Sequence, residues 1–237
     1  MDLVELSPAF VATREALRAV ACQVIAPARK AADGHIGLAA TGDGFGSPPF
    51  GEHARRIVVR GTSLVIEDGG TVVAREPITT IGALAAVVGI EPTDDPGIGE
   101  GRTKVAPDTV LTVDLEASQA LGAWYSLADM ALVELRDELA GFGTPSAITL
   151  WPEHFDLAFD WGGDAERRVN LGASPGDAGS DEPYLYVGPW DVEWFTPDGY
   201  WNAPFGARLG YRELATHADP LAGAAAFFAE GIARLAH

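Results

Sequence analysis

The 237-residue sequence predicts an α+β protein in which antiparallel β-sheet packs against about four helices. Two observations support this prediction. Short β-rich runs follow one another in turn-linked groups, and helical stretches separate the groups, an order typical of antiparallel rather than parallel sheet. The apolar fraction of 47% is ordinary for a globular chain, so a core can form without disulfides.

The first 90 residues predict a helix, a β-meander and a second, short helix. Ser7-Pro8 is typical of a helix start, and Pro27 is expected to end that helix. A glycine- and proline-rich loop is expected at 42–51. Thr79 or Thr80 is expected to cap the short helix that Gly89 ends. The expected strands are 36–40, 56–60, 63–67 and 71–75.

Residues 91–107 are predicted to be a linker between an N-terminal half, 1–90, and a C-terminal half, 108–237. This segment has turn-forming residues and no periodicity. Its acidic part, 94–100, lacks the ligand spacing of a calcium loop. We expect the two halves to pack into one compact unit.

The C-terminal half predicts a long helix, a run of strands and a terminal helix. Asp114 is placed to cap a helix over 115–140 that carries an apolar stripe. A second helix is expected from Asp219-Pro220 to Leu235. Residues 172–183 are expected to form a loop. The expected strands are 109–113, 147–150, 154–161, 167–171, 184–187 and 207–211.

Strict alternation makes the strand that ends at Trp161 the most informative one. Alternate side chains on a strand point to opposite faces, so one face is predicted to be a buried aromatic and aliphatic surface. The other face is either solvated or lines a site. The buried set is Phe155, Leu157, Phe159 and Trp161, and the opposite set is His154, Asp156, Ala158 and Asp160.

Two aromatic, glycine-rich segments share a short sequence repeat, which we call the internal echo. The segment from Asp43 to Gly51 and the segment from Asp198 to Gly206 share the order Asp-Gly-aromatic, then Pro-Phe-Gly, at identical spacing. A duplicated half-domain explains this echo, and so does chance.

Charge and composition limit the classes of partner. The formal net charge of −18 disfavours binding to nucleic acid and to anionic membrane surfaces. The sequence has no stretch of about 18 apolar residues and no signal-peptide pattern, so we expect a cytoplasmic protein without membrane contact. The single cysteine, Cys22, is expected to be a buried thiol.

His154 and Asp156 are the first candidates for a site. On a strand they would lie about 6.6 Å apart on one face, which suits a shared metal ion, a His base oriented by a carboxylate, or a ligand contact. A structural, hydrogen-bonded histidine is the alternative. Zinc sites use at least three protein ligands and no second His motif is in register, so we expect no metal and no cofactor. Nucleotide, redox and zinc-protease motifs are also absent from the sequence.

Aromatic residues crowd into the segment 184–201, which includes Trp190, Trp194 and Trp201. These tryptophans lie in a loop rich in Gly, Pro and Asp. They either line a ligand pocket or partner surface, or fold back onto the sheet.

A set of motifs lies between residues 146 and 237: Trp151-Pro152 with His154 to Ala158, Asn170 with Gly172, Ser174 to Asp177, Glu182-Pro183-Tyr184 with Tyr186, and Asp219-Pro220. Taken together, these motifs resemble a family of uncharacterised bacterial proteins. The resemblance implies one shared constellation of side chains but supplies no substrate. The implied constellation is His154, Asp156, Asn170, Asp177, Glu182 and Tyr184.

The sequence therefore favours a small-molecule-binding protein or an enzyme with a pocket near His154 and Asp156. The alternative is a non-catalytic protein-interaction module that uses its aromatic loops. Neither a catalytic residue nor an oligomeric state is predicted. The candidate ligand-binding residues are His154, Asp156, Asp177, Glu182, Tyr184 and Trp194.

Overall fold

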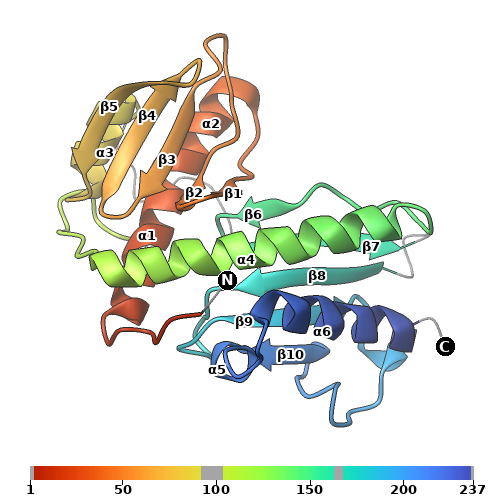
Figure 1. The fold of residues 1–237 in the computed structure, drawn as a ribbon. Coiled ribbons are helices and arrows are strands. Elements are labelled where there is room, and N and C mark those ends of the chain that lie inside the picture. Colours follow the sequence, from red (N-terminus) through yellow and green to blue (C-terminus); the bar gives the residue numbers. More distant parts are fainter. Residues whose placement is uncertain (1–2, 92–103, 163–167, 236–237) are drawn as a thin grey trace. The chain divides into compact units, whose positions relative to one another are not determined.

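The computed structural model describes residues 3–91, 104–162 and 168–235 (Figure 1). The chain forms two compact units. Unit 1 comprises Met1–Val4, Leu127–Thr149 and Asp156–His237, and unit 2 comprises Glu5–Ser126 and Leu150–Phe155. This division does not coincide with the expected halves 1–90 and 108–237. Most of the expected linker, 92–103, including the segment 94–100, lies outside the described residues.

Unit 2 begins with one uninterrupted helical stretch instead of a helix that ends near Pro27. Helix α1 (Phe10–Val20) continues through a π-helical turn, η1 (Ala21–Ile25), into α2 (Ala26–Asp33). Proline has no N–H and its ring crowds the carbonyl four residues earlier. The wider π turn directly before Pro27 gives that ring room, so the helix runs on to Gly34, whose φ of 80° ends it.

The sheet of unit 2 is an antiparallel meander whose strand order follows the chain. The expected loop 42–51 contains a strand, because Gly44 and Gly46 allow close approach rather than irregular backbone. A Cβ on Gly44 would lie 2.1 Å from the Val59 oxygen, and one on Gly46 would lie 2.5 Å from the Ile57 oxygen. The strands are β1 (Ala39–Thr41), β2 (Gly44–Gly46), β3 (Arg56–Arg60), β4 (Ser63–Asp68) and β5 (Thr71–Pro77).

Helix α3 (Ile81–Val88) follows the meander and has both expected ends. The Thr80 hydroxyl accepts a hydrogen bond from the Ala83 N–H, and Gly89 closes the helix with φ of 85°. The strand expected over 109–113 does not form. Only Val110 makes an isolated bridge, to Thr80.

Three aromatic rings form the centre of the unit 2 core. Phe45, Tyr125 and Phe155 pack edge to face, with ring centroids 5.0–6.3 Å apart. The Tyr125 hydroxyl also donates to the Phe155 carbonyl at 2.5 Å. Tyr125 belongs to helix α4 (Leu115–Leu139), whose first turn is capped by the Asp114 carboxylate as expected. Cys22 is buried, and its thiol donates to the Pro152 carbonyl at 2.8 Å.

The second sheet is also an antiparallel meander, with strand order β10-β9-β8-β7-β6. Two helices follow it, α5 (Tyr211–Leu214) and α6 (Pro220–Leu235). With antiparallel sheets and helices packed against them, the predicted α+β class is confirmed. The strands are β6 (Thr149–Trp151), β7 (Asp156–Gly162), β8 (Arg168–Ser174), β9 (Tyr184–Pro189) and β10 (Ala207–Gly210).

Alternation divides the unit 1 sheet into an apolar and a polar face. Leu157 and Phe159 on β7 are buried as predicted, whereas Trp161 is half-buried and donates its indole N–H to the Leu139 carbonyl. Helix α6 packs closely on the apolar face, since a Cβ on Gly231 would lie 3.0 Å from the Val187 methyl groups. Figure 1 shows α6 and the C-terminal half of α4 on the same side of this sheet.

The two sheets share one order of elements along the chain: helix, five-stranded antiparallel meander, helix. The echoed loops do not occupy equivalent places in this repeat. Residues 43–51 lie around β2 and before β3, whereas residues 198–206 directly precede β10, the last strand. The repeated topology and the repeated loop sequence are therefore separate features.

The outer edge of β10 is covered by a side chain. The Asn202 amide donates to the Arg208 carbonyl and its oxygen accepts from the Arg208 N–H, both at 2.9 Å. Asn202 thus forms the pair of hydrogen bonds that a neighbouring strand would form at this residue. Within the described part of the chain, no helix is both long and apolar enough to cross a membrane.

Replacing Phe159 by Ala is expected to lower the free energy of unfolding by about 3–5 kcal/mol, because the ring is buried and its removal leaves a cavity. Urea unfolding monitored by circular dichroism measures this change. Val72→Ala is the control: Val72 lies on β5 with 49% of its surface exposed, and its replacement should change stability by less than about 1 kcal/mol. Equal losses in the two variants would contradict the assignment of Phe159 to the core.

Candidate functional site

The predicted pairing of His154 and Asp156 on one strand face is wrong. Strand β7 begins only at Asp156, and residues 152–155 form a turn. Phe155 has φ of 56°, a left-handed conformation that breaks the alternation before the strand. His154 is exposed and belongs to unit 2, whereas Asp156 is buried and belongs to unit 1.

Asp156 instead pairs with a tyrosine from strand β9, two strands away in the same sheet. The Tyr186 hydroxyl on β9 donates a hydrogen bond to the Asp156 carboxylate on β7, across the intervening strand β8. This crossing requires Gly172, which lies opposite Tyr186 in the β8–β9 register. A Cβ at Gly172 would lie 2.6 Å from the Tyr186 hydroxyl oxygen, so any side chain there would displace the phenol.

A second tyrosine–aspartate pair lies beside the first. The Tyr184 hydroxyl donates to the Asp177 carboxylate at 2.6 Å, and the Tyr184 and Tyr186 ring centroids are 6.4 Å apart. Phe205 contacts both rings, with centroid distances of 6.3 Å. The Arg208 guanidinium lies 5.6 Å from the centre of the Tyr184 ring. Three rings, two carboxylates and one cation therefore form a single cluster.

Both phenols hold their protons more tightly than a free tyrosine. Burial and the neighbouring Asp156 carboxylate raise the pKa of Tyr186 well above its ordinary value. Burial and the hydrogen bond to Asp177 raise the pKa of Tyr184 to about 12. At neutral pH the two tyrosines are therefore neutral hydrogen-bond donors.

The other end of the polar face carries a tryptophan held by polar side chains. The Trp190 indole N–H donates to the Asn170 side-chain oxygen at 3.0 Å, and the Arg168 guanidinium lies 5.7 Å from the indole centre. Arg168 also forms an ion pair with Asp160. Asn170 pairs with Asp160 on one side and with Gly188 on the other, which places this group on the face that carries Tyr186.

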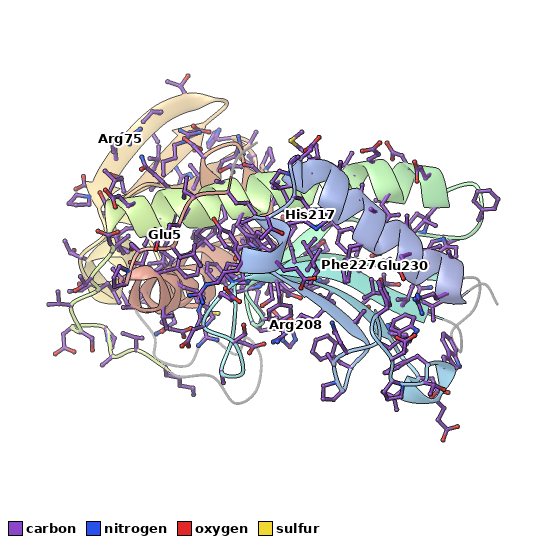
Figure 2. All side chains as sticks on the ribbon, turned by 60° about the horizontal axis from the view of Figure 1, so that its bottom comes forward. Glu5, Arg75, Arg208, His217, Phe227 and Glu230 are labelled. Atoms are coloured by element: carbon purple, nitrogen blue, oxygen red, sulfur yellow. The ribbon has the colours of Figure 1, made fainter. Side chains whose placement is uncertain are left out.

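We call this surface the polar face of unit 1. It lies opposite the helices, as Figure 2 illustrates with Arg208 on one side of the sheet and Phe227 and Glu230 of α6 on the other. The register places Arg208 opposite Tyr186 and therefore away from Val187, which contacts α6. Its members are Asp156, Asp160, Arg168, Asn170, Gly172, Tyr184, Tyr186, Gly188, Trp190, Phe205 and Arg208, with Asp177 bound to Tyr184.

The structure brings together only some of the predicted site residues. Asp156, Tyr184 and Asp177 join one cluster, while His154 lies in the other unit. Glu182 is half-buried beside the end of β10, with its carboxylate 3.3 Å from the Arg212 guanidinium. Trp194 lies, half-buried, in the short 3₁₀ helix η2 (Val192–Trp194) rather than on a strand.

Sequence reasoning missed the residues that complete the cluster. The sequence predicts that Gly172 begins the loop 172–183, whereas β8 extends through it to Ser174. Gly172 lies opposite Tyr186 only in the β8–β9 register, which a loop at Gly172 does not provide. The alternation of Tyr184 with Tyr186 and of Asn170 with Gly172 was the available signal, since both pairs place their members on one face.

Among the residues that the structure describes, no group of three or more His, Cys, Asp and Glu side chains is arranged to hold a metal ion. Comparison with protein-family models, curated proteins and solved structures finds no match to this chain. The candidate site therefore rests on its own geometry.

Stability is expected to fall in alkaline solution because folding raises the pKa values of Tyr184 and Tyr186. Their contribution is complete below about pH 10, where unfolded tyrosine begins to ionise, and is lost as pH rises through the folded-state pKa values. Urea unfolding between about pH 9 and 12 measures the slope. Tyr186→Phe should make the decline shallower; an unchanged slope would contradict the assigned Tyr186 environment.

Proposed function

We propose that unit 1 is a small-molecule-binding module whose ligand lies on the polar face beside Tyr186 and Asp156. The observation that carries this proposal is the Tyr186–Asp156 hydrogen bond across Gly172. The Tyr186 phenol reaches across Gly172 to the buried Asp156 carboxylate, so this hydrogen bond holds a hydroxyl and a carboxylate in fixed positions next to each other. Fixed polar groups bind with a smaller loss of side-chain freedom than mobile ones.

The surroundings of this pair support a ligand contact. Tyr186 is half-buried and Phe205 is 40% exposed, so polar and aromatic surface meet where solvent has access. Small-molecule sites combine apolar rings with a few oriented polar groups in this way. His154 is not part of the proposed ligand site on the polar face.

A protein-interaction module is the second candidate, and one observation favours it. Trp190 and Val192 are each 56% exposed, in the same segment as Phe205. Exposed apolar side chains grouped on a surface are typical of protein contacts, where tryptophan is often a dominant residue. This candidate predicts that binding depends on Val192 as strongly as on Tyr186.

Ligand screening by nuclear magnetic resonance tests the proposal. The probes are three groups of small molecules: neutral saccharides, amines and carboxylates. Tyr186→Phe removes the hydroxyl and is expected to weaken binding of the probe by roughly tenfold, the effect of one lost hydrogen bond between the phenol oxygen and the probe. Circular dichroism confirms that the variant is folded.

Tyr211→Phe is the matched control. Tyr211 is a buried tyrosine of the same unit, but its hydroxyl donates to the Val4 carbonyl and not to the polar face. Its replacement should leave probe affinity unchanged. Failure of every probe to shift resonances of polar-face residues would contradict the proposal, as would equal loss of affinity in the two variants.

A further inference from the structure

We infer that the ligand of the polar face is a neutral saccharide and that the Trp190 indole is the platform for one of its rings. This inference rests on the function proposed above and adds the chemical class of the ligand. Four features support it. They are the fixed and exposed Trp190 indole, the glycine beside it at position 188, the planar polar groups of Asn170 and of the Asp160–Arg168 ion pair, and the length of the polar face.

Trp190 is both exposed and held in place. More than half of its surface, 56%, is open to solvent. Its backbone N–H donates to the Arg168 carbonyl at 2.9 Å and its indole N–H donates to Asn170. An exposed aromatic side chain fixed by two hydrogen bonds loses little conformational freedom when a ligand covers it. The Arg168 guanidinium lies over one face of the indole, so a flat apolar surface, such as the C–H face of a pyranose, would stack against the other face.

The surface of the sheet next to Trp190, which we call the floor, is formed by the backbone of Gly188. Gly188 lies opposite Asn170, and the nearest atom to a Cβ built there is the Phe205 carbonyl oxygen, at 3.5 Å. A side chain at this position would thus meet no steric barrier from the protein itself. Gly188 thus adds no side chain to the polar face between Tyr186 and Trp190, and a ligand can approach the backbone closely there.

The polar groups around this floor suit hydroxyl groups better than ionic ones. Asn170 is exposed and carries both a donor and an acceptor group. Asp160 and Arg168 form an ion pair, so neither offers an isolated charge to an ionic ligand. The chain as a whole carries −18, which opposes phosphorylated or otherwise anionic ligands. Planar amide, carboxylate and guanidinium groups can each make paired hydrogen bonds to neighbouring hydroxyls.

The polar face is long enough for more than one ring. Tyr186 and Trp190 are four residues apart, which corresponds to roughly 13 Å along an extended strand. Trp190 lies at one end and the Tyr186–Asp156 pair at the other, with Gly188 between them. A linear oligosaccharide, which is longer than a single pyranose ring, matches this span.

Titration calorimetry with four neutral trisaccharides tests this inference: maltotriose, cellotriose, xylotriose and triacetylchitotriose. Spermidine and citrate serve as probes of the cationic and anionic classes. At least one trisaccharide should bind, and Trp190→Ala should weaken it by roughly tenfold, because ring stacking is lost. Asn170→Ala should also weaken it, since the indole loses its hydrogen-bond partner.

Trp151→Ala is the matched control, because Trp151 is another exposed tryptophan, 40% accessible, on the edge strand β6, and β7 and β8 lie between β6 and β9 in the sheet. Its replacement should leave trisaccharide affinity unchanged. The inference is overturned if no trisaccharide binds, or if binding survives in Trp190→Ala. Binding of spermidine or citrate that depends on Tyr186, without any trisaccharide binding, would overturn the saccharide inference and leave the proposed function standing. Absence of binding by every probe would overturn both.

Discussion

The hydrogen bond from Tyr186 to Asp156 depends on a glycine, Gly172, at the position that lies between the two side chains. Gly172 leaves the middle strand bare, and only this allows a phenol on β9 to reach a carboxylate on β7. The bond joins β9 and β7 through their side chains, across β8, which pairs with both strands through the backbone. The neighbouring Tyr184, Phe205 and Arg208 then pack around a ring whose position is already fixed. The side chains of this cluster thus hold one another in defined positions on the polar face.

The fold was predictable where local chemistry and tertiary packing agree. Asp114, Thr80 and Gly89 mark helix ends through their own backbone and side-chain hydrogen bonds, and the structure places them there. The alternation from Leu157 to Phe159 likewise follows from burial of one sheet face. In each case the information lies within a few residues of the feature that it specifies.

The site was less predictable because its determinants are distant in sequence. Phe155 was assigned to the strand by its parity, yet its left-handed backbone places His154 outside β7. Gly172 resembled a loop residue because glycine weakens strands in general. Its actual role appears only once β9 is aligned beside β8. Gly44 and Gly46 were misassigned for the same reason, since close approach to β3 cannot be inferred from their own segment.

The amide of Asn202 has a consequence for how chains behave in concentrated solution. An uncovered edge strand is a template on which another chain can add its own backbone, the first step toward fibrous aggregates. At β10 the N–H and carbonyl of Arg208 are already occupied by one side chain. A strand of a second molecule therefore cannot bond to the Arg208 backbone unless it displaces Asn202. This opposes extension of the sheet from one molecule into the next.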